Sequence, residues 1–212
     1  MADISFQNTS QFFFARFVFH VTTVQKITQV SFISEYYLVQ YWDDLQDPRT
    51  KNFFLVGGPP YLVFAIMAFF LFFALSLGPK LMAHRAPFDA LKPLITFYNF
   101  AMVAFNAYFV CFIIVNCDYG RRFLIWEFPD RSDTSPQTLL ELNVCWWYYM
   151  TKFLDLFDTV FFVLRKKFAH LSFLHLYHHT SVIIFGYFCF KCCANAPFMF
   201  LFALLNGIIH TR

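Results

Sequence analysis

The residues with the clearest chemical potential are the three histidines of the stretch His175-Leu-Tyr-His178-His179. On an α-helix, which turns by about 100° per residue, these positions fall within an arc of about 100° and share one face. Core packing does not require clustered imidazoles, whereas metal ligation, proton transfer and nucleophilic attack all use them. The spacing therefore predicts a reactive site near the beginning of an apolar helix.

A second polar group, formed by Lys152, Asp155, Asp158 and Thr159, lies in the apolar segment that precedes the histidines. On one continuous helix these residues share an arc of about 120°. Each charge inside a membrane costs roughly 2.5–3.5 kcal/mol, so three of them require a reason. One interpretation is a self-neutralising cluster that joins helices. The interpretation that the nearby histidines favour is the polar wall of an active site.

The remaining histidines have different expected roles. His210 follows Asn206 by four residues, so both share a helix face on which the amide can orient the imidazole. A plain packing contact explains this pair equally well. His170 points to a different face from the cluster and is predicted to be solvated at the membrane interface. His20 and His84 lie in a terminal patch and in a loop, where we expect ordinary polar residues.

The histidines and the charged residues must be positioned by secondary structure, and the composition indicates that this structure consists of membrane helices. Of 212 residues, 59% are hydrophobic and 14% are charged, whereas soluble domains carry about 25% charged residues. Phe53–Pro79 and Leu94–Asn116 contain no charged residue over 27 and 23 positions, and a helix that crosses a bilayer needs roughly 20 apolar residues. We therefore predict an all-α, polytopic membrane helical bundle.

Further helices are predicted from three segments that are apolar apart from a few polar residues: Val144–Leu164, Leu171–Phe190 and Ala194–Ile209. The bundle then has about five transmembrane helices. Phe12–Val24 is too short to span the bilayer, and we expect it to lie along the interface or to be disordered. The chain is accordingly divided into an N-terminal lumenal segment, residues 1–51, and a transmembrane domain, residues 52–212. A basic region typical of signal peptides is missing, so the first span is expected to direct its own insertion.

The charges of the connecting segments indicate the orientation in the membrane. Pro79–Lys92 and the turn Arg165-Lys166-Lys167 are basic, whereas Cys117–Glu141 contains more acids than bases. By the positive-inside rule the two basic connections are cytosolic and the N-terminus is lumenal. The Asn8-Thr9-Ser10 sequon would then lie on the side where glycosylation occurs. The net charge of +3 is distributed as membrane flanks, which indicates no nucleic-acid partner.

The six cysteines form no pair of CxxC motifs, so no zinc site is predicted. Cys117 and Cys192–Cys193 flank the lumenal ends of predicted spans, where a disulfide is permitted. Small apolar residues in a membrane are the simpler interpretation.

Several motifs in one order resemble the ELO-type elongases of very long chain fatty acids. The resemblance covers roughly Gly78 to Thr211. It is carried by Gly78-Pro79 with Met82, Arg85 and Pro87, Leu91-Lys92, Tyr98-Asn99, the Lys152–Thr159 pattern (similar to the family's Lys-x-x-Glu/Asp-x-x-Asp-Thr signature), Leu164–Lys167, the histidine stretch and Asn206-x-x-x-His210. A lone HxxHH pattern would be weak, but this series is specific.

The resemblance implies the condensation of a fatty acyl-CoA with malonyl-CoA to a 3-oxoacyl-CoA, carbon dioxide and free CoA, in the endoplasmic reticulum membrane. Family members are seven-helix proteins in which helices two to seven enclose a tunnel for the acyl chain. Both substrates are coenzyme A thioesters, and no bound cofactor or metal ion is implied. The lipid bilayer, other elongase subunits and enzymes of the elongation cycle are the further partners implied.

The family's mechanism, carried over to this chain, makes His178 the nucleophile that forms an acyl-enzyme. His210 would act opposite it on the malonyl unit, as proton carrier or charge stabiliser. His175 and His179 would tune and orient the nucleophile. Water must be excluded from such a site, because an acyl-imidazole hydrolyses readily.

The carboxylates Asp155 and Asp158 would fix the imidazole tautomers, and Lys152 would pair with these acids or with a substrate carboxylate. Basic residues at the cytosolic ends of the helices would contact coenzyme A, although they serve equally well as topology signals: Lys80, Arg85, Lys92, Arg165, Lys166 and Lys167.

The chain departs from the family pattern after His210-Thr211, where the family continues with a Met-Tyr-x-Tyr-Tyr segment and two more spans. We therefore expect a fragment or a shortened splice product with poor activity. Two rival functions are considered. A truncated, non-catalytic relative would modulate full-length elongases, and a membrane di-iron desaturase or hydroxylase would need more histidines than the seven present.

Overall fold

The computed structural model describes Tyr36, residues 40–116 and residues 130–210 of the chain, without the side chain of His210. Several predictions concern residues outside these ranges: the interfacial segment Phe12–Val24, the Asn8 sequon, His20 and a disulfide at Cys117.

The chain divides into two compact units, with the boundary between Asp44 and Leu45. The second unit is built from helices, and the described part of the chain contains no strand, which confirms the predicted all-α class. The helices in chain order are α2 (Tyr41–Leu45), α3 (Tyr61–Phe72), α4 (Gly78–Met82), α5 (Lys92–Asn116), α6 (Pro136–Leu154), α7 (Leu156–Leu164), α8 (Phe173–Cys193) and α9 (Pro197–His210), with single turns at Pro48–Thr50, Asp89–Leu91 and Phe168–His170.

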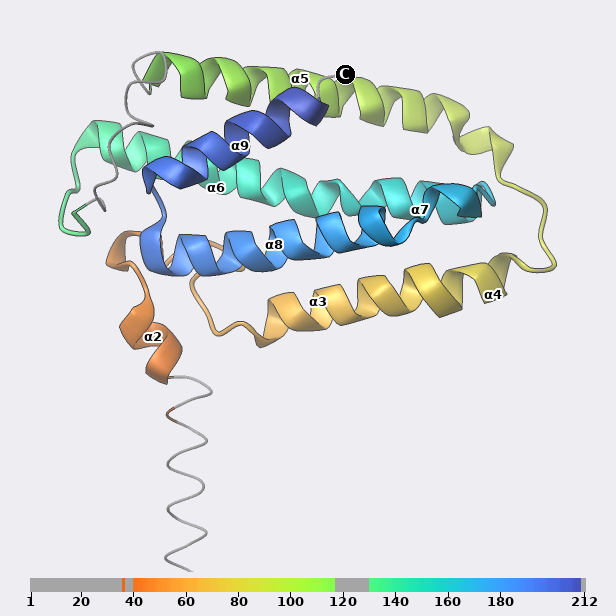
Figure 1. Cartoon of the computed structure of the whole chain (residues 1–212), viewed down its shortest axis with the longest axis horizontal. Coiled ribbons are helices and arrows are strands. Elements are labelled where there is room, and N and C mark those ends of the chain that lie inside the picture. Colours follow the sequence, from red (N-terminus) through yellow and green to blue (C-terminus); the bar gives the residue numbers. More distant parts are fainter. Residues whose placement is uncertain (1–35, 37–39, 117–129, 211–212) are drawn as a thin grey trace, which may run out of the picture. The chain divides into compact units, whose positions relative to one another are not determined.

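The long helices of the second unit lie side by side (Figure 1). α8 contacts both α3 and α6, while α5 packs against α6 and α9. One core lies between α3, α6 and α8 and includes Val63, Tyr149 and Ile183. A second core lies between α5, α6 and α9 and includes Phe109 and Tyr148. α6 therefore contributes to both cores, which places its polar residues at the centre of the bundle.

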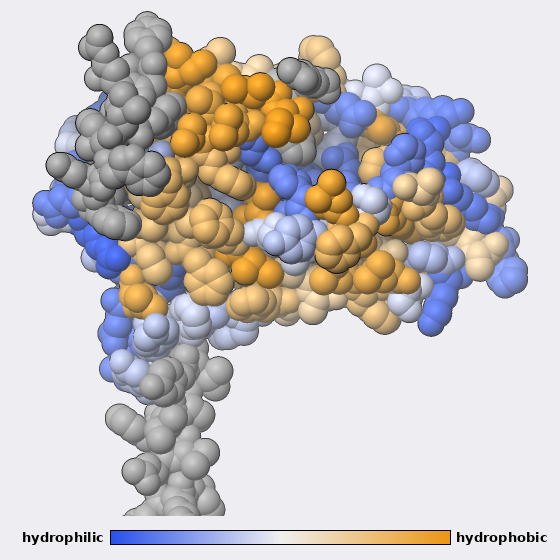
Figure 2. Space-filling view, viewed as in Figure 1, coloured by the Kyte–Doolittle hydropathy of each residue, from blue (hydrophilic) through white to orange (hydrophobic). Residues whose placement is uncertain are grey.

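Two helical stretches are long and apolar enough to cross a membrane: Tyr61–Met82, of 22 residues, and Asp89–Asn116, of 28 residues. Pro197–Ile209 is apolar but shorter. Figure 2 shows apolar side chains across much of the middle of the visible face and hydrophilic side chains gathered toward its ends. Soluble proteins rarely expose such large apolar areas. The second unit is thus a membrane helical bundle, and the number of five spans stays a prediction.

The first span contains a π-helical turn, Phe73–Leu77, between α3 and α4. It comes directly before Gly78-Pro79, and proline has no amide hydrogen to donate, so the hydrogen-bond ladder cannot continue unchanged. A Cβ at Gly78 would lie 2.7 Å from Cγ1 of Val163 on α7. The glycine therefore allows the first span to approach α7 closely.

The segment Val144–Leu164, which the sequence predicts as one helix, forms two helices in the structure. α6 ends at Leu154 and α7 begins at Leu156, with Asp155 in a turn between them. Asp155 keeps right-handed helical dihedral angles, with φ of −56° and ψ of −21°, and its amide donates to the Thr151 carbonyl at 2.9 Å. The predicted helical segment is therefore interrupted at this one residue and is not replaced by a loop.

Residues 45–58, which precede α3, pack against the last turns of α8. Lys191 is fully buried, and its Nζ donates to Gln46 Oε1 at 2.8 Å, to the Gly58 carbonyl at 2.8 Å and to the Val56 carbonyl at 3.3 Å. A buried ammonium group needs such oxygen partners. The segment that the sequence grouped partly with the N-terminal region therefore belongs physically to the helical unit.

Candidate active site

The three histidines of the cluster lie together at the beginning of α8. The helix begins after Ser172, whose Oγ accepts a hydrogen bond from the His175 amide at 3.2 Å, as expected of an N-cap serine. The ring centroids of His175 and His179 are 4.4 Å apart, and those of His178 and His179 are 5.6 Å apart. His179 is buried, whereas His175 and His178 are half-buried. The structure therefore brings together the imidazoles that the spacing groups on one face.

α7 holds the cluster through a hydroxyl group. Thr159 Oγ1 lies 2.8 Å from His175 Nε2, and Thr159 is fully buried. The Phe162 ring lies between two histidines, with its centroid 5.5 Å from that of His175 and 5.1 Å from that of His170. His170 is exposed, as predicted, and stacks on this phenylalanine. Thr159 and Phe162 therefore both connect α7 to the histidine cluster.

The described contacts of the two acidic residues are with Lys152, which is one of the predicted pairings, and with Tyr98. Asp155 Oδ2 accepts a hydrogen bond from Lys152 Nζ at 2.8 Å, and both side chains are 4% exposed. The Lys152 ammonium also lies 4.6 Å from the centre of the Tyr148 ring. Asp158 interacts with the side chain of Tyr98 on α5. A role of these two carboxylates in fixing imidazole tautomers stays a prediction.

Asn206 on α9 is joined to α6 by a tyrosine that the sequence analysis does not single out. Its Nδ2 donates to the Tyr148 hydroxyl at 2.9 Å, and that hydroxyl donates to the Ala203 carbonyl at 3.0 Å. A contact between the side chains of Asn206 and His210 stays a prediction, because the structure does not describe the imidazole of His210. Tyr148 lies four residues before Lys152, so the two side chains are neighbours on one helix face. This spacing is the sequence signal that could have identified Tyr148 as part of the polar network.

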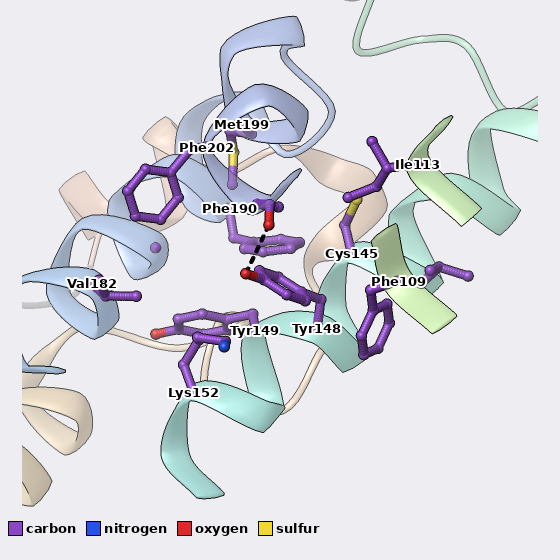
Figure 3. Close-up of a pocket in the computed structure, with 13 residues that line it drawn as sticks. Phe109, Ile113, Cys145, Tyr148, Tyr149, Lys152, Val182, Phe190, Met199 and Phe202 are labelled. Atoms are coloured by element: carbon purple, nitrogen blue, oxygen red, sulfur yellow. Dashed lines mark hydrogen bonds between the residues drawn. The ribbon is translucent and has the colours of Figure 1, made fainter. Parts of the chain in front are cut away.

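A cavity, called here the inner cavity, lies beside this network (Figure 3). Its volume is about 40 Å³, and Lys152 is the charged residue among the described side chains that line it. Gly186 lines it from α8, where a Cβ would lie 2.7 Å from Tyr149 Cε2. The glycine thus allows Tyr149 to approach α8 closely. The other lining residues are Phe109, Ile113, Val144, Cys145, Tyr148, Val182, Phe190, Met199, Phe202 and Ala203.

A larger hollow, called here the outer groove, runs between α5 and α6. Its volume is about 1160 Å³. Residues from the stretches 97–109 of α5 and 144–154 of α6 line it, together with Phe54 and Leu55, and nearly all of these side chains are apolar or aromatic. At one end the helices are joined by Tyr98, whose hydroxyl donates to the Leu154 carbonyl at 3.0 Å.

The two basic connections lie together at one end of the bundle, as predicted. The Phe88 amide donates to the Leu164 carbonyl at 3.1 Å, and Lys166 Nζ donates to the Ala83 carbonyl at 3.3 Å. Asp89 lies 3.0 Å from Lys92 and 4.0 Å from Arg165. The residues that we call the basic mouth are Lys80, Arg85, Lys92, Arg165, Lys166 and Lys167.

Lys166 closes α7 in a left-handed conformation, with φ of 52°. Glycine or asparagine is usual at such a position. The Lys167 amide donates to the Phe162 carbonyl at 2.8 Å across this turn, which is the hydrogen bond of a Schellman motif. Lys166 thus adopts a left-handed backbone conformation that is unusual for lysine, and its amine contacts the Ala83 carbonyl in the connection between α4 and α5.

The fold and the site together define a class: an integral membrane bundle that contains clustered imidazoles, a buried lysine–aspartate pair and apolar hollows. Comparison with known proteins identifies the family. Residues 55–212 match the sequence model of the ELO family, described as GNS1/SUR4, and the chain belongs to this family.

Several relatives of known name support the assignment. Very long chain fatty acid elongase 7 of Rattus norvegicus is 40% identical over 171 residues, which cover 80% of this chain and 59% of that protein. Very long chain fatty acid elongase 1 of Homo sapiens is 33% identical over 173 residues, with coverages of 77% and 57%. Very long chain fatty acid elongase 7 of Drosophila melanogaster is 34% identical over 168 residues, with coverages of 79% and 50%. The chain thus spans half to three fifths of these relatives' length.

Proposed function

We propose that the protein acts in fatty acid elongation as a very-long-chain 3-oxoacyl-CoA synthase. It condenses a fatty acyl-CoA with malonyl-CoA and lengthens the acyl chain by two carbons. The observation that carries the proposal is the histidine cluster, contacted by Thr159, in a chain of the ELO family. Membership of this family favours the elongase reaction over a di-iron desaturase.

In the first step, His178 attacks the thioester carbonyl of the acyl-CoA. A bond forms between an imidazole nitrogen and the acyl carbon, the C–S bond breaks, and CoA leaves as the thiol with the imidazole proton. The structure supports His178 over its neighbours in this role. The Nε2 atom of His175 is engaged by Thr159, and His179 is buried, whereas His178 is half-buried.

In the second step, malonyl-CoA loses carbon dioxide, and the electron pair of the broken C–C bond remains on the α-carbon. This carbon attacks the acyl-imidazole carbonyl, a new C–C bond forms, and the imidazole of His178 leaves. The products are 3-oxoacyl-CoA and carbon dioxide, and the histidine is restored when the departing imidazolate takes up one proton from water, which replaces the proton lost to CoA in the first step. His210 is proposed to carry a proton or stabilise charge at this step, and Lys152 and Asp155 hold the surrounding polar network.

The basic mouth is proposed to contact the phosphates of coenzyme A. Six basic residues gather there, and Asp89 is the acid in contact with two of them. Lys and Arg are the usual partners of phosphate groups. The proposed orientation has the basic mouth on the cytosolic side of the endoplasmic reticulum membrane and the N-terminus in the lumen. The bilayer and other elongation enzymes are the proposed partners.

The proposed function is tested by reconstituting the purified chain in liposomes with a fatty acyl-CoA and malonyl-CoA labelled at carbon 2. The expected result is label in a 3-oxoacyl-CoA two carbons longer than the substrate. Rat elongase 7, assayed in parallel, shows that the conditions support turnover. Label found only in unreacted malonyl-CoA or in acetyl-CoA, with an active rat control, would contradict the proposal for this chain.

Thr159→Val is expected to lower kcat by about two- to tenfold, because one hydrogen bond to His175 is lost while the side-chain shape is kept. Thr159→Ser keeps the hydroxyl and should retain most of the activity. The 15N chemical shifts of labelled histidine provide a second readout, since the valine variant alone should shift the Nε2 resonance of His175. Equal losses in the serine and valine variants would mean that packing, and not the hydrogen bond, explains the effect.

A further inference from the structure

The inner cavity and the outer groove are separated by a thin wall. Phe109 of α5 and Val144 of α6 line both hollows. One side of this wall faces the cavity that contains Lys152, and the other faces the open groove between the helices. Each helix thus contributes one side chain that lies between the cavity and the outside of the bundle.

The wall is closed in this structure by packing between aromatic rings. Phe109 is 5% exposed, and its ring meets the Tyr148 ring edge to face, with centroids 5.1 Å apart. Val144 is half-buried. The hydroxyl contact between Tyr98 and Leu154 joins α5 and α6 at the far end of the groove. A rotation of the Phe109 side chain would therefore join the two hollows without breaking a described hydrogen bond.

We propose that Phe109 and Val144 form a lateral portal through which an unbranched hydrocarbon chain passes between the bilayer and the inner cavity. The groove side is apolar and about 16 Å long, from Phe97 to Tyr108 at 1.5 Å per residue. Lipid hydrocarbon is the medium that such a groove meets in a membrane. The proposal rests on the proposed function only for the identity of the chain as a fatty acyl group.

The dimensions favour a hydrocarbon chain over a protein segment as the occupant. The inner cavity has a volume of about 40 Å³, whereas pockets for small molecules usually reach 300–1,000 Å³. A helix is about 10–12 Å wide and cannot continue from the groove into this cavity. A chain of methylene groups is narrow, needs no hydrogen-bond partners, and can follow the groove through the wall to Lys152.

The test uses the native Cys145, which lines the inner cavity but not the outer groove. A variant keeps this cysteine and has alanine at the other five positions. It is reconstituted in liposomes and treated with N-hexadecylmaleimide, a reagent that dissolves in the bilayer, and the adduct is quantified by mass spectrometry. Neither coenzyme A nor turnover is needed, so failure of the proposed function would not alter the result.

In this background, Phe109→Ala is expected to speed the labelling of Cys145 by about two- to tenfold, the effect of removing one aromatic pair. Ile113→Ala is the matched control, because Ile113 is also buried on α5 and lines the inner cavity without touching the groove. Its labelling rate should stay at that of the parent. Equal acceleration in both variants would overturn the portal, since any enlargement of the cavity would then suffice.

A second pair of variants leaves the buried wall intact. Ala104 is exposed within the groove, and Ala65 is exposed on α3 away from it. Ala104→Trp is expected to slow labelling severalfold, whereas Ala65→Trp should have no effect. Equal rates in these two variants would contradict a path through the groove. So would faster labelling by a charged maleimide that cannot enter the bilayer, because that result shows access from water.

Discussion

Replacing His178 by alanine is expected to reduce condensation by at least about a thousandfold, since residual activity without a nucleophile depends on binding alone. The physical reason is the loss of the proposed acyl-enzyme step. Thr159 Oγ1 lies 2.8 Å from the Nε2 atom of His175, and His179 is buried. The bundle should still insert and fold, because a half-buried side chain is removed at the beginning of α8.

The measurement is single-turnover release of CoA from a fatty acyl-CoA in the absence of malonyl-CoA, together with the mass of the protein. The parent should gain one acyl group, and the alanine variant should gain none. His170→Ala is the control, since this histidine is exposed and stacks on Phe162 outside the cluster. An acyl adduct or full turnover in the His178 variant would mean that another residue is the nucleophile.

Replacing Asp155 by asparagine is expected to destabilise the bundle by about 3–5 kcal/mol, because the ammonium of Lys152 would remain buried without its counter-charge. Both side chains are 4% exposed, and their charged atoms are 2.8 Å apart. For a domain of this size, the loss corresponds to a fall in melting temperature of roughly 10 °C. Thermal denaturation of the purified protein in detergent micelles, followed by size-exclusion fluorescence, measures the change.

The chain offers a matched pair for comparison. Asp89 and Lys92 are also an aspartate and a lysine three positions apart, at 3.0 Å, but their side chains are 68% and 58% exposed. Asp89→Asn should therefore leave the melting temperature nearly unchanged, because an exposed ion pair is screened by solvent. The double variant Lys152→Met with Asp155→Leu should recover much of the stability lost in Asp155→Asn. Similar melting temperatures for the two single variants would show that burial does not determine the strength of the inner pair.

The helices were predictable where the sequence carries one strong signal. The uncharged runs that contain α3 and α5 are long enough to cross a bilayer, so they predicted helices there. The two basic connections predicted that both loops lie at one end of the bundle. The interruption at Asp155 was not predictable, because it is confined to one residue whose own dihedral angles are helical. Spacing alone assigns Lys152 and Asp155 to one regular helix.

The site was predictable in its histidines but not in its contacts. Acids are the expected partners of imidazoles, so Asp155 and Asp158 were predicted to orient the histidines. In the structure, the hydroxyl group of Thr159 contacts His175. A hydroxyl group carries little sequence signal. Tyr148 was missed for a related reason, because tyrosine is common in membrane helices and its polar role depends on Asn206 of another helix.

The buried Lys191 has a consequence for where the protein can be divided. The region shared with the family begins at residue 55, but the oxygen atoms that receive the Lys191 ammonium include one on Gln46. A protein cut at the start of the homologous region would lose the Gln46 oxygen that accepts a hydrogen bond from Lys191 on α8. The compact unit therefore begins at Leu45, ten residues before the region that matches the family, and these ten residues are part of the helical bundle.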